Sequence, residues 1–142
     1  MTRAAYQEAI EWAYQTEIPL GLECDVHFSA DDELICLHDL TLDRTSTSSG
    51  PAYQLTVAEL KLIDFGSRSV PDPEPEQREL VTLRELMIMV RDARRDHVPV
   101  SLVIETKHPT TAAARWRNGL RRCSLSSAGI SRGHPFGYFP FQ

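Results

Sequence analysis

Two carboxylates spaced two residues apart are the first feature of this sequence with chemical consequences. Glu23 and Asp25 belong to an alternating segment, residues 22–28, whose other face is apolar. Residues two apart on a strand point to the same side, so the two carboxylates share one face, about 7 Å apart along the chain. Such a pair is costly unless a cation neutralises it, and Mg²⁺ and Ca²⁺ prefer oxygen ligands. A solvated edge strand with an outward polar face is the alternative, and spacing alone leaves both open.

A second charged pair follows the apolar residues 98–104. Glu105 and Lys107 again share one face of a strand, near its end. In a parallel α/β sheet, active sites gather at the carboxyl ends of the strands. Glu105 is therefore a candidate third oxygen ligand, and Lys107 could hold a phosphate as a point charge. The competing interpretation is an ordinary surface Glu–Lys pair, which contributes little to stability.

A histidine stands at a third strand end. His38 and Asp39 follow the apolar residues 34–37, where a strand is expected to meet a loop. Imidazole is the side chain most easily poised for proton transfer near neutral pH, so His38 is a candidate acid or base. The alternative is a structural histidine. His27 could line the face of Glu23 and Asp25, but we expect it to serve packing or to be solvated.

Three segments are predicted to form the helices that support these residues. The first is residues 2–15, in which apolar residues recur at helical spacing and Thr2 is the N-cap candidate. Capping boxes, Thr followed three residues later by Glu, open a short helix at Thr56 and a longer one from Thr82 through Asp96. The expected apolar faces are Ala5, Ala9, Ile10 and Ala13 in the first helix, and Leu83, Leu86, Met87, Val90 and Ala93 in the last. Residues 66–78 contain three prolines and are predicted to be a long loop without a helix.

The strands are expected at residues 22–28, 34–37 and 98–106. Strand, helix and strand in this order are typical of an α/β fold with a parallel sheet. Cys24 and Cys36 lie inside apolar runs and are expected to be small buried hydrophobes. Together with Cys123 they form no CxxC pair and leave an odd count, which argues against a disulfide framework and a thiolate zinc site.

Composition and charge narrow the class of protein. The 142 residues are 42% hydrophobic and 25% charged, as in an ordinary soluble globular domain. No apolar run approaches the roughly 18–20 residues needed to cross a bilayer, and no signal core opens the chain, so we expect a cytoplasmic location without a membrane span. The net charge is −5, yet no acid follows Glu105, while six Lys and Arg residues do. A basic tail can contact nucleic acid, but we do not expect a nucleic-acid partner here.

Taken together, these motifs resemble the glycerophosphodiester phosphodiesterase family. The order and spacing of the pieces agree over residues 2 to about 109. The pieces are Glu23-Cys24-Asp25-Val26, Ser29-Ala30-Asp31, Leu34 to His38-Asp39, Asp43-Arg44-Thr45-Ser46, Thr56 to Leu60, Asp64-Phe65-Gly66, Thr82-Leu83 and Ile104-Glu105-Thr106-Lys107.

The resemblance implies a (β/α)8 TIM barrel, of which this α/β chain would be an incomplete portion, roughly that of the second and third strands. The implied activity is hydrolysis of small-molecule glycerophosphodiesters to glycerol 3-phosphate and an alcohol. By the resemblance, Glu23, Asp25 and Glu105 are ligands of a divalent cation, Mg²⁺ or Ca²⁺. His38 is the general acid that protonates the departing alkoxide, and Lys107 contacts the phosphate.

The sequence also departs from the family pattern. That pattern opens with His-Arg-Gly and Pro-Glu-Asn-Thr, of which only the last residue is matched here, by Thr2. The family's first catalytic histidine is thus missing, and a complete barrel takes about 250 residues. We therefore expect a partial phosphodiesterase domain over residues 1–109 and an irregular basic tail over 110–142, the tail being interpreted as translation in a shifted reading frame. The alternative function is an inactive fragment that acts at most as a metal-binding or interaction module.

Overall fold

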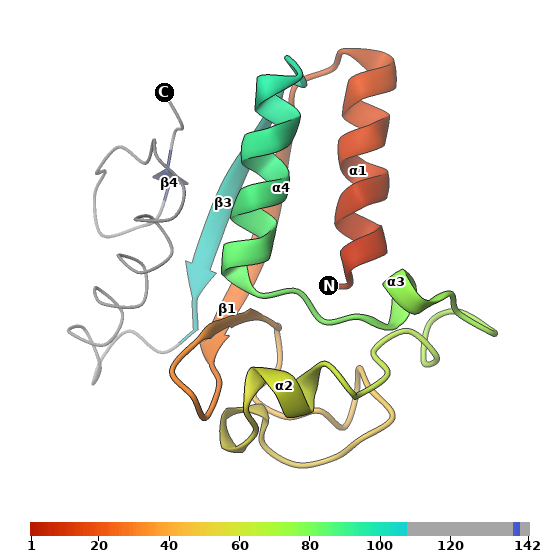
Figure 1. Cartoon of the computed structure of the whole chain (residues 1–142), viewed down its shortest axis with the longest axis vertical. Coiled ribbons are helices and arrows are strands. Elements are labelled where there is room, and N and C mark those ends of the chain that lie inside the picture. The colour runs from red at the N-terminus through yellow and green to blue at the C-terminus, as the bar shows by residue number, and fades with distance from the viewer. Residues whose placement is uncertain (108–137, 140–142) are drawn as a thin grey trace.

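A computed structural model describes residues 1–107 and the short strand at residues 138–139 (Figure 1). The elements are α1 Arg3–Thr16, β1 Leu20–Phe28, β2 Leu34–Cys36, the 3₁₀ turn η1 Ala52–Gln54, α2 Val57–Leu60, α3 Pro75–Arg78, α4 Leu83–Arg95, β3 Val100–Thr106 and β4 Tyr138–Phe139. Cys123 and, apart from β4, the predicted irregular tail lie outside the described residues. Within the described part, no helix is both long enough and apolar enough to span a membrane.

The strands form one mixed sheet in the order β2-β1-β3-β4. β1 and β3 are parallel, from the pair Leu20–Val100 to the pair Val26–Thr106, whereas β2 and β4 are antiparallel to their neighbours. The expectation of a parallel sheet is therefore wrong for β2. Only residues 29–33 join β1 to β2, which allows a hairpin, because a parallel pair needs a crossover of a dozen or more residues.

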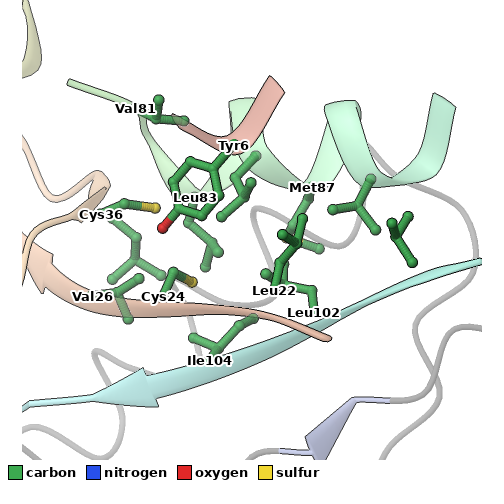
Figure 2. Packing of buried hydrophobic residues seen from close by; sticks show 14 of the residues in the cluster. Tyr6, Leu22, Cys24, Val26, Cys36, Val81, Leu83, Met87, Leu102 and Ile104 are labelled. Carbon is green, nitrogen blue, oxygen red and sulfur yellow. The ribbon is translucent and has the colours of Figure 1, made fainter. Parts of the chain in front are cut away.

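The main core lies between the sheet and the helices α1 and α4. The two helices stand side by side, with α4 in front of β1 and β3 in the view of Figure 1. Figure 2 shows Met87 of α4 packed over Leu22 and Leu102 of the two parallel strands, while Leu83 of the same helix lies nearer to Tyr6 and Cys24. All the α4 residues predicted to be apolar core are buried. Cys24 and Cys36 are also buried with free thiols, as predicted. The apolar side of the sheet is thus closed by helices, and its other side carries the charged residues.

Helix α1 differs in detail from the prediction. Its buried residues are Ala4, Tyr6 and Ala13, while Ala5 is exposed. The stripe is rotated because Tyr6 reaches into the core, and its hydroxyl donates to the Glu23 carbonyl oxygen at 3.2 Å. A tyrosine can be part of the core when its hydroxyl has a hydrogen-bond partner. The spacing of the aliphatic residues alone did not predict this.

The helix starts follow local chemistry closely. Both predicted capping boxes are present, at Thr56 and at Thr82. Thr2 occupies the N-cap position of α1 but makes no side-chain capping hydrogen bond. The prediction of a helix-free loop over residues 66–78 is wrong at its end, where α3 forms a single turn. Pro75 begins that turn, a position where proline is tolerated because its missing N–H would have no partner.

A second apolar cluster supports the loops that follow β2. It consists of Ile35, Leu37, Leu42, Ala52, Leu60, Phe65 and Leu80. Leu42 is fully buried in it, and the Leu42 amide donates to the Gly50 carbonyl oxygen at 2.9 Å. The loop after His38 is therefore anchored by packing and by backbone hydrogen bonds.

Gly66 offers a steric test of this region. An added Cβ would lie 2.5 Å from the carbonyl oxygen of Gln77 and 3.0 Å from its carbonyl carbon. Because both atoms are backbone, Gly66→Ala is expected to lower the free energy of unfolding by about 1–3 kcal/mol in urea titrations. Gly21→Ala is the matched control, since its Cβ would meet only Ser101 Oγ, at 3.7 Å, and should change stability by less than about 0.5 kcal/mol. Equal effects at the two positions would contradict the steric argument.

Candidate metal and acid–base site

Three carboxylates meet on the sheet face opposite the helices. The parallel register places Asp25 beside Glu105 and Glu23 beside Val103. One oxygen from each of Glu23, Asp25 and Glu105 lies within 4.8 Å of the other two. The structure therefore brings together the three residues that the sequence singled out as cation ligands, from two neighbouring strands.

The three differ in exposure. Asp25 is 3% exposed, whereas Glu23 and Glu105 are open to solvent. Asp25 was expected on a polar face, yet its side chain is buried. At its backbone, the amide of Leu37, the residue after β2, donates to the Asp25 carbonyl oxygen at 3.0 Å. Asp25 Oδ1 is buried without a hydrogen-bond partner. A buried, unsatisfied carboxylate oxygen is costly unless a positive charge stands close to it.

Lys107 supplies part of that charge. Its Nζ lies 2.7 Å from Asp25 Oδ1, an ion pair without hydrogen-bond alignment, and donates to Glu105 Oε1 at 2.7 Å. The close contact with the Asp25 carboxylate, and then that with Glu105, raises the pKa of Lys107, so the ammonium stays charged. Lys107, the residue predicted to contact the phosphate, thus lies within the cluster as a counterion of the carboxylates.

The cluster retains an excess of negative charge. Burial first, and then repulsion from Asp25 and Glu105, raise the pKa of Glu23, while Lys107 and His38 act in the opposite direction. One ammonium faces three carboxylates, and all the available donors are hard oxygen atoms. These properties fit Mg²⁺ or Ca²⁺, which bind carboxylate oxygens and neutralise clustered negative charge.

His38 lies on an exposed stretch after β2. Its side chain is 61% exposed, and its Nδ1 is 2.7 Å from Asp39 Oδ1. The nearby His27 is buried, and its Nε2 donates to the His38 carbonyl oxygen at 3.1 Å. His27 therefore serves packing and supports the backbone of His38, consistent with the expectation for it.

Asp39 and Arg44 received no role from the sequence. In the structure Arg44 Nε donates to Asp39 Oδ2 at 2.7 Å, and Arg44 Nη2 donates to Asp39 Oδ1 at 2.9 Å. These hydrogen bonds and the one to His38 hold the pKa of Asp39 well below its usual range. The conformation of the loop determines this contact, so the periodicity of helix or strand could not predict it. In the sequence, only the family motif Asp43-Arg44-Thr45-Ser46 pointed to Arg44.

The sequence of this chain is similar to a family of known proteins. The model of the glycerophosphoryl diester phosphodiesterase family matches residues 2–131. A Mycobacterium tuberculosis (strain CDC 1551 / Oshkosh) protein named "Probable glycerophosphodiester phosphodiesterase 1" is 37% identical over 122 residues, which are 84% of this chain and 42% of that protein. A glycerophosphodiester phosphodiesterase of Caldanaerobacter subterraneus subsp. tengcongensis is 35% identical over 65 residues, 46% of this chain and 25% of that protein.

Solved structures share the fold. An Oleispira antarctica phosphodiesterase in complex with the product sn-glycerol-3-phosphate has a TM-score of 0.70 at 25% identity, covering 89% of this chain and 46% of that chain. A glycerophosphodiester phosphodiesterase from Agrobacterium tumefaciens has a TM-score of 0.61 at 24% identity, covering 81% and 45%. The chain spans less than half the length of these relatives and structures. With the family model matched along most of its length, this chain belongs to the glycerophosphoryl diester phosphodiesterase family.

Proposed function

We propose that this chain carries the cation site and an acid–base residue for metal-dependent hydrolysis of glycerophosphodiesters to glycerol 3-phosphate and an alcohol. The convergence of Glu23, Asp25 and Glu105 within 4.8 Å carries this proposal. Family membership supports the reaction class, and the complex of the Oleispira antarctica phosphodiesterase with sn-glycerol-3-phosphate supports the product.

The same proposal extends to the fold. We assign the chain to a portion of a (β/α)8 barrel in which β1 and β3 are neighbouring barrel strands joined through α4. Their parallel pairing supports this, as does the position of Glu105 near the carboxyl end of β3. Sites of barrel enzymes lie at that end of the strands.

Glu23, Asp25 and Glu105 would hold the cation. A divalent cation bound there would polarise the phosphoryl oxygens and offset the charge that develops on them. Lys107, which already lies between two of the carboxylates, would add a positive charge beside the phosphate. We assign Mg²⁺ or Ca²⁺ because the donors are all carboxylate oxygens.

His38 would act as the general acid. Alkoxides are poor leaving groups, so a proton delivered to the ester oxygen as its bond to phosphorus breaks avoids a full negative charge on that oxygen. Nδ1 of His38 is engaged by Asp39, so Nε2 is the nitrogen that would deliver the proton. The imidazole is exposed enough for a substrate to reach it.

The direct test is release of glycerol 3-phosphate by the purified 142-residue chain. With glycerophosphocholine as substrate, we expect release in the presence of MgCl₂ or CaCl₂, loss of release with excess EDTA, and recovery when the cation is added back. Glycerol 3-phosphate can be followed with a coupled dehydrogenase assay.

Calorimetry of the same samples separates this function from the alternative. Cation binding without any release would favour a metal-binding module that is catalytically inactive. Absence of both would remove the proposed site altogether.

A further inference from the structure

His38 belongs to a hydrogen-bonded triad with Asp39 and Arg44, which its proposed role alone does not require. Arg44 grips both carboxylate oxygens of Asp39, at 2.7 and 2.9 Å, and Asp39 Oδ1 in turn lies 2.7 Å from His38 Nδ1. A forked Arg–carboxylate pair fixes both the position and the plane of the carboxylate. The ring of His38 is therefore held through an oriented anion.

The exposures of the three residues bear on what the pair does. The side chain of Asp39 is 23% exposed, whereas those of His38 and Arg44 are 61% and 66% exposed. Exposed ion pairs contribute little to stability, so the fork is a weak device for holding the fold together. Its geometric effect is larger, because a carboxylate acceptor selects the tautomer of a histidine and the direction of its ring.

The backbone near Arg44 and the backbone of His38 are both held by contacts with the rest of the molecule. Arg44 follows Leu42, which is fully buried, and the Leu42 carbonyl oxygen accepts from the Ser46 amide at 3.0 Å. The His38 carbonyl oxygen accepts from His27 at 3.1 Å, and the preceding amide, that of Leu37, donates to Asp25 O. Asp39 therefore orients the ring of a residue whose backbone is already tied to a candidate cation ligand.

We propose that Asp39, clamped by Arg44, is the positioning residue of His38, keeping a proton on Nδ1 so that Nε2 alone exchanges protons with the substrate. Its catalytic meaning rests on the proposed function. Asp39 accepts from Nδ1–H in both charge states of the ring. When Nε2 gives its proton to the leaving oxygen, the neutral ring is left as the Nδ1–H tautomer, which Asp39 stabilises. Asp39 itself gains and loses no proton.

Imidazole ¹⁵N–¹H correlation spectra of the purified chain test this without reference to catalysis. At an alkaline pH, where an ordinary imidazole is neutral, wild-type His38 is expected to be mainly the Nδ1–H tautomer. In Asp39→Asn the amide can donate to Nδ1 as well as accept, so we expect the Nε2–H form to increase. A wild-type His38 that is mainly Nε2–H would overturn the proposal, whatever the variants do.

Substitutions of Arg44 test the clamp. Arg44→Gln leaves the carboxylate in place but removes the fork, so we expect a mixed tautomer population between those of wild type and Asp39→Asn. Arg44→Lys keeps the charge without the fork and should recover only part of the difference. Asp92→Asn and Arg91→Gln are matched controls from another Asp–Arg pair, on α4, in which Arg91 Nε donates to Asp92 at 2.8 Å. The controls should leave His38 unchanged.

Kinetics complete the design wherever the wild-type chain releases glycerol 3-phosphate. Asp39→Asn should lower kcat about 10- to 100-fold with little change in KM, because the role proposed for Asp39 is to orient the acid and not to bind the substrate. A tautomer shift together with an unchanged kcat, or no tautomer shift, would overturn the proposal. A wild-type chain without hydrolysis would count against the proposed function, while the spectra would still decide whether Asp39 and Arg44 position His38.

Discussion

Asp25→Asn is expected to abolish divalent-cation binding, weakening it by at least about 100-fold, and to remove metal-dependent release of glycerol 3-phosphate. Asp25 is the buried member of the carboxylate cluster, and the strand register places it between Glu23 on its own strand and Glu105 on the next. Asparagine preserves the size of the side chain but removes one negative charge and one hard anionic ligand. Calorimetric titration with MgCl₂ and CaCl₂ measures the loss directly.

Thermal unfolding supplies a second readout of the same change. A cation present at about 100 times its dissociation constant stabilises the folded state by about 2.7 kcal/mol. For a domain of this size, that is a rise in Tm on the order of 10 °C. The rise should vanish in Asp25→Asn, while the Tm without cation changes much less, because one of three mutually repelling carboxylates has been neutralised.

Asp92→Asn is the matched control for this experiment. Its carboxylate is 50% exposed on α4, paired with Arg91, and does not belong to the cluster. The control variant should show the same cation-dependent rise in Tm as the wild type. A rise of equal size in Asp25→Asn would mean that the cation binds elsewhere, and the assignment of the site would be wrong.

His38→Asn should lower kcat for glycerophosphocholine by about 10²- to 10⁴-fold, the usual contribution of a general acid, while the calorimetric affinity for Mg²⁺ or Ca²⁺ stays unchanged. Asparagine cannot deliver a proton to the leaving alkoxide, and residue 38 is not one of the three carboxylates that would hold the cation. Initial rates of glycerol 3-phosphate release, together with calorimetry on the same preparations, measure both properties.

The leaving group distinguishes a general acid from a residue that merely supports the site. A glycerophosphodiester of p-nitrophenol has a leaving group that departs readily as an anion, so it needs little protonation. The deficit of His38→Asn should therefore shrink strongly with that substrate. A deficit of the same size with both substrates would contradict the acid role and point to altered geometry.

His97→Asn is the matched control for the histidine. His97 is exposed after α4 and has a positive φ of 63°, a conformation that asparagine adopts more readily than most residues. The same change of side chain is thus made without backbone strain at a position outside the cluster. Its kcat and its cation affinity should both match those of the wild type.

Local pattern in the sequence was sufficient for much of the scaffold. The capping boxes at Thr56 and Thr82 and the buried face of α4 follow from spacings of three and four residues, and all are present. Strand alternation correctly placed Glu23 and Asp25 on one side of β1, and Glu105 on the side of β3 away from the core. These features depend on residues close together in the chain, so their geometry is contained in the periods of helix and strand.

Other features of the scaffold could not be read from the same patterns. The antiparallel course of β2 and the burial of Tyr6 depend on how separate elements pack. Arg3 of α1 pairs with Glu79 at 2.6 Å, a contact between residues 76 positions apart that no local spacing encodes. Alternation would also leave Asp25 in solvent, whereas packing buries it.

For the site, the sequence by itself determined which side chains could supply oxygen ligands, a proton and a positive charge, and on which face of its strand each carboxylate lies. The tertiary structure alone decided that Asp25 stands beside Glu105, that Lys107 serves as their counterion, and that Arg44 clamps Asp39 against His38. Strand register and loop conformation are set by contacts between distant segments, where one residue of slip would turn a side chain to the opposite face. Periodicity carries no information about that choice, so only the folded chain resolves it.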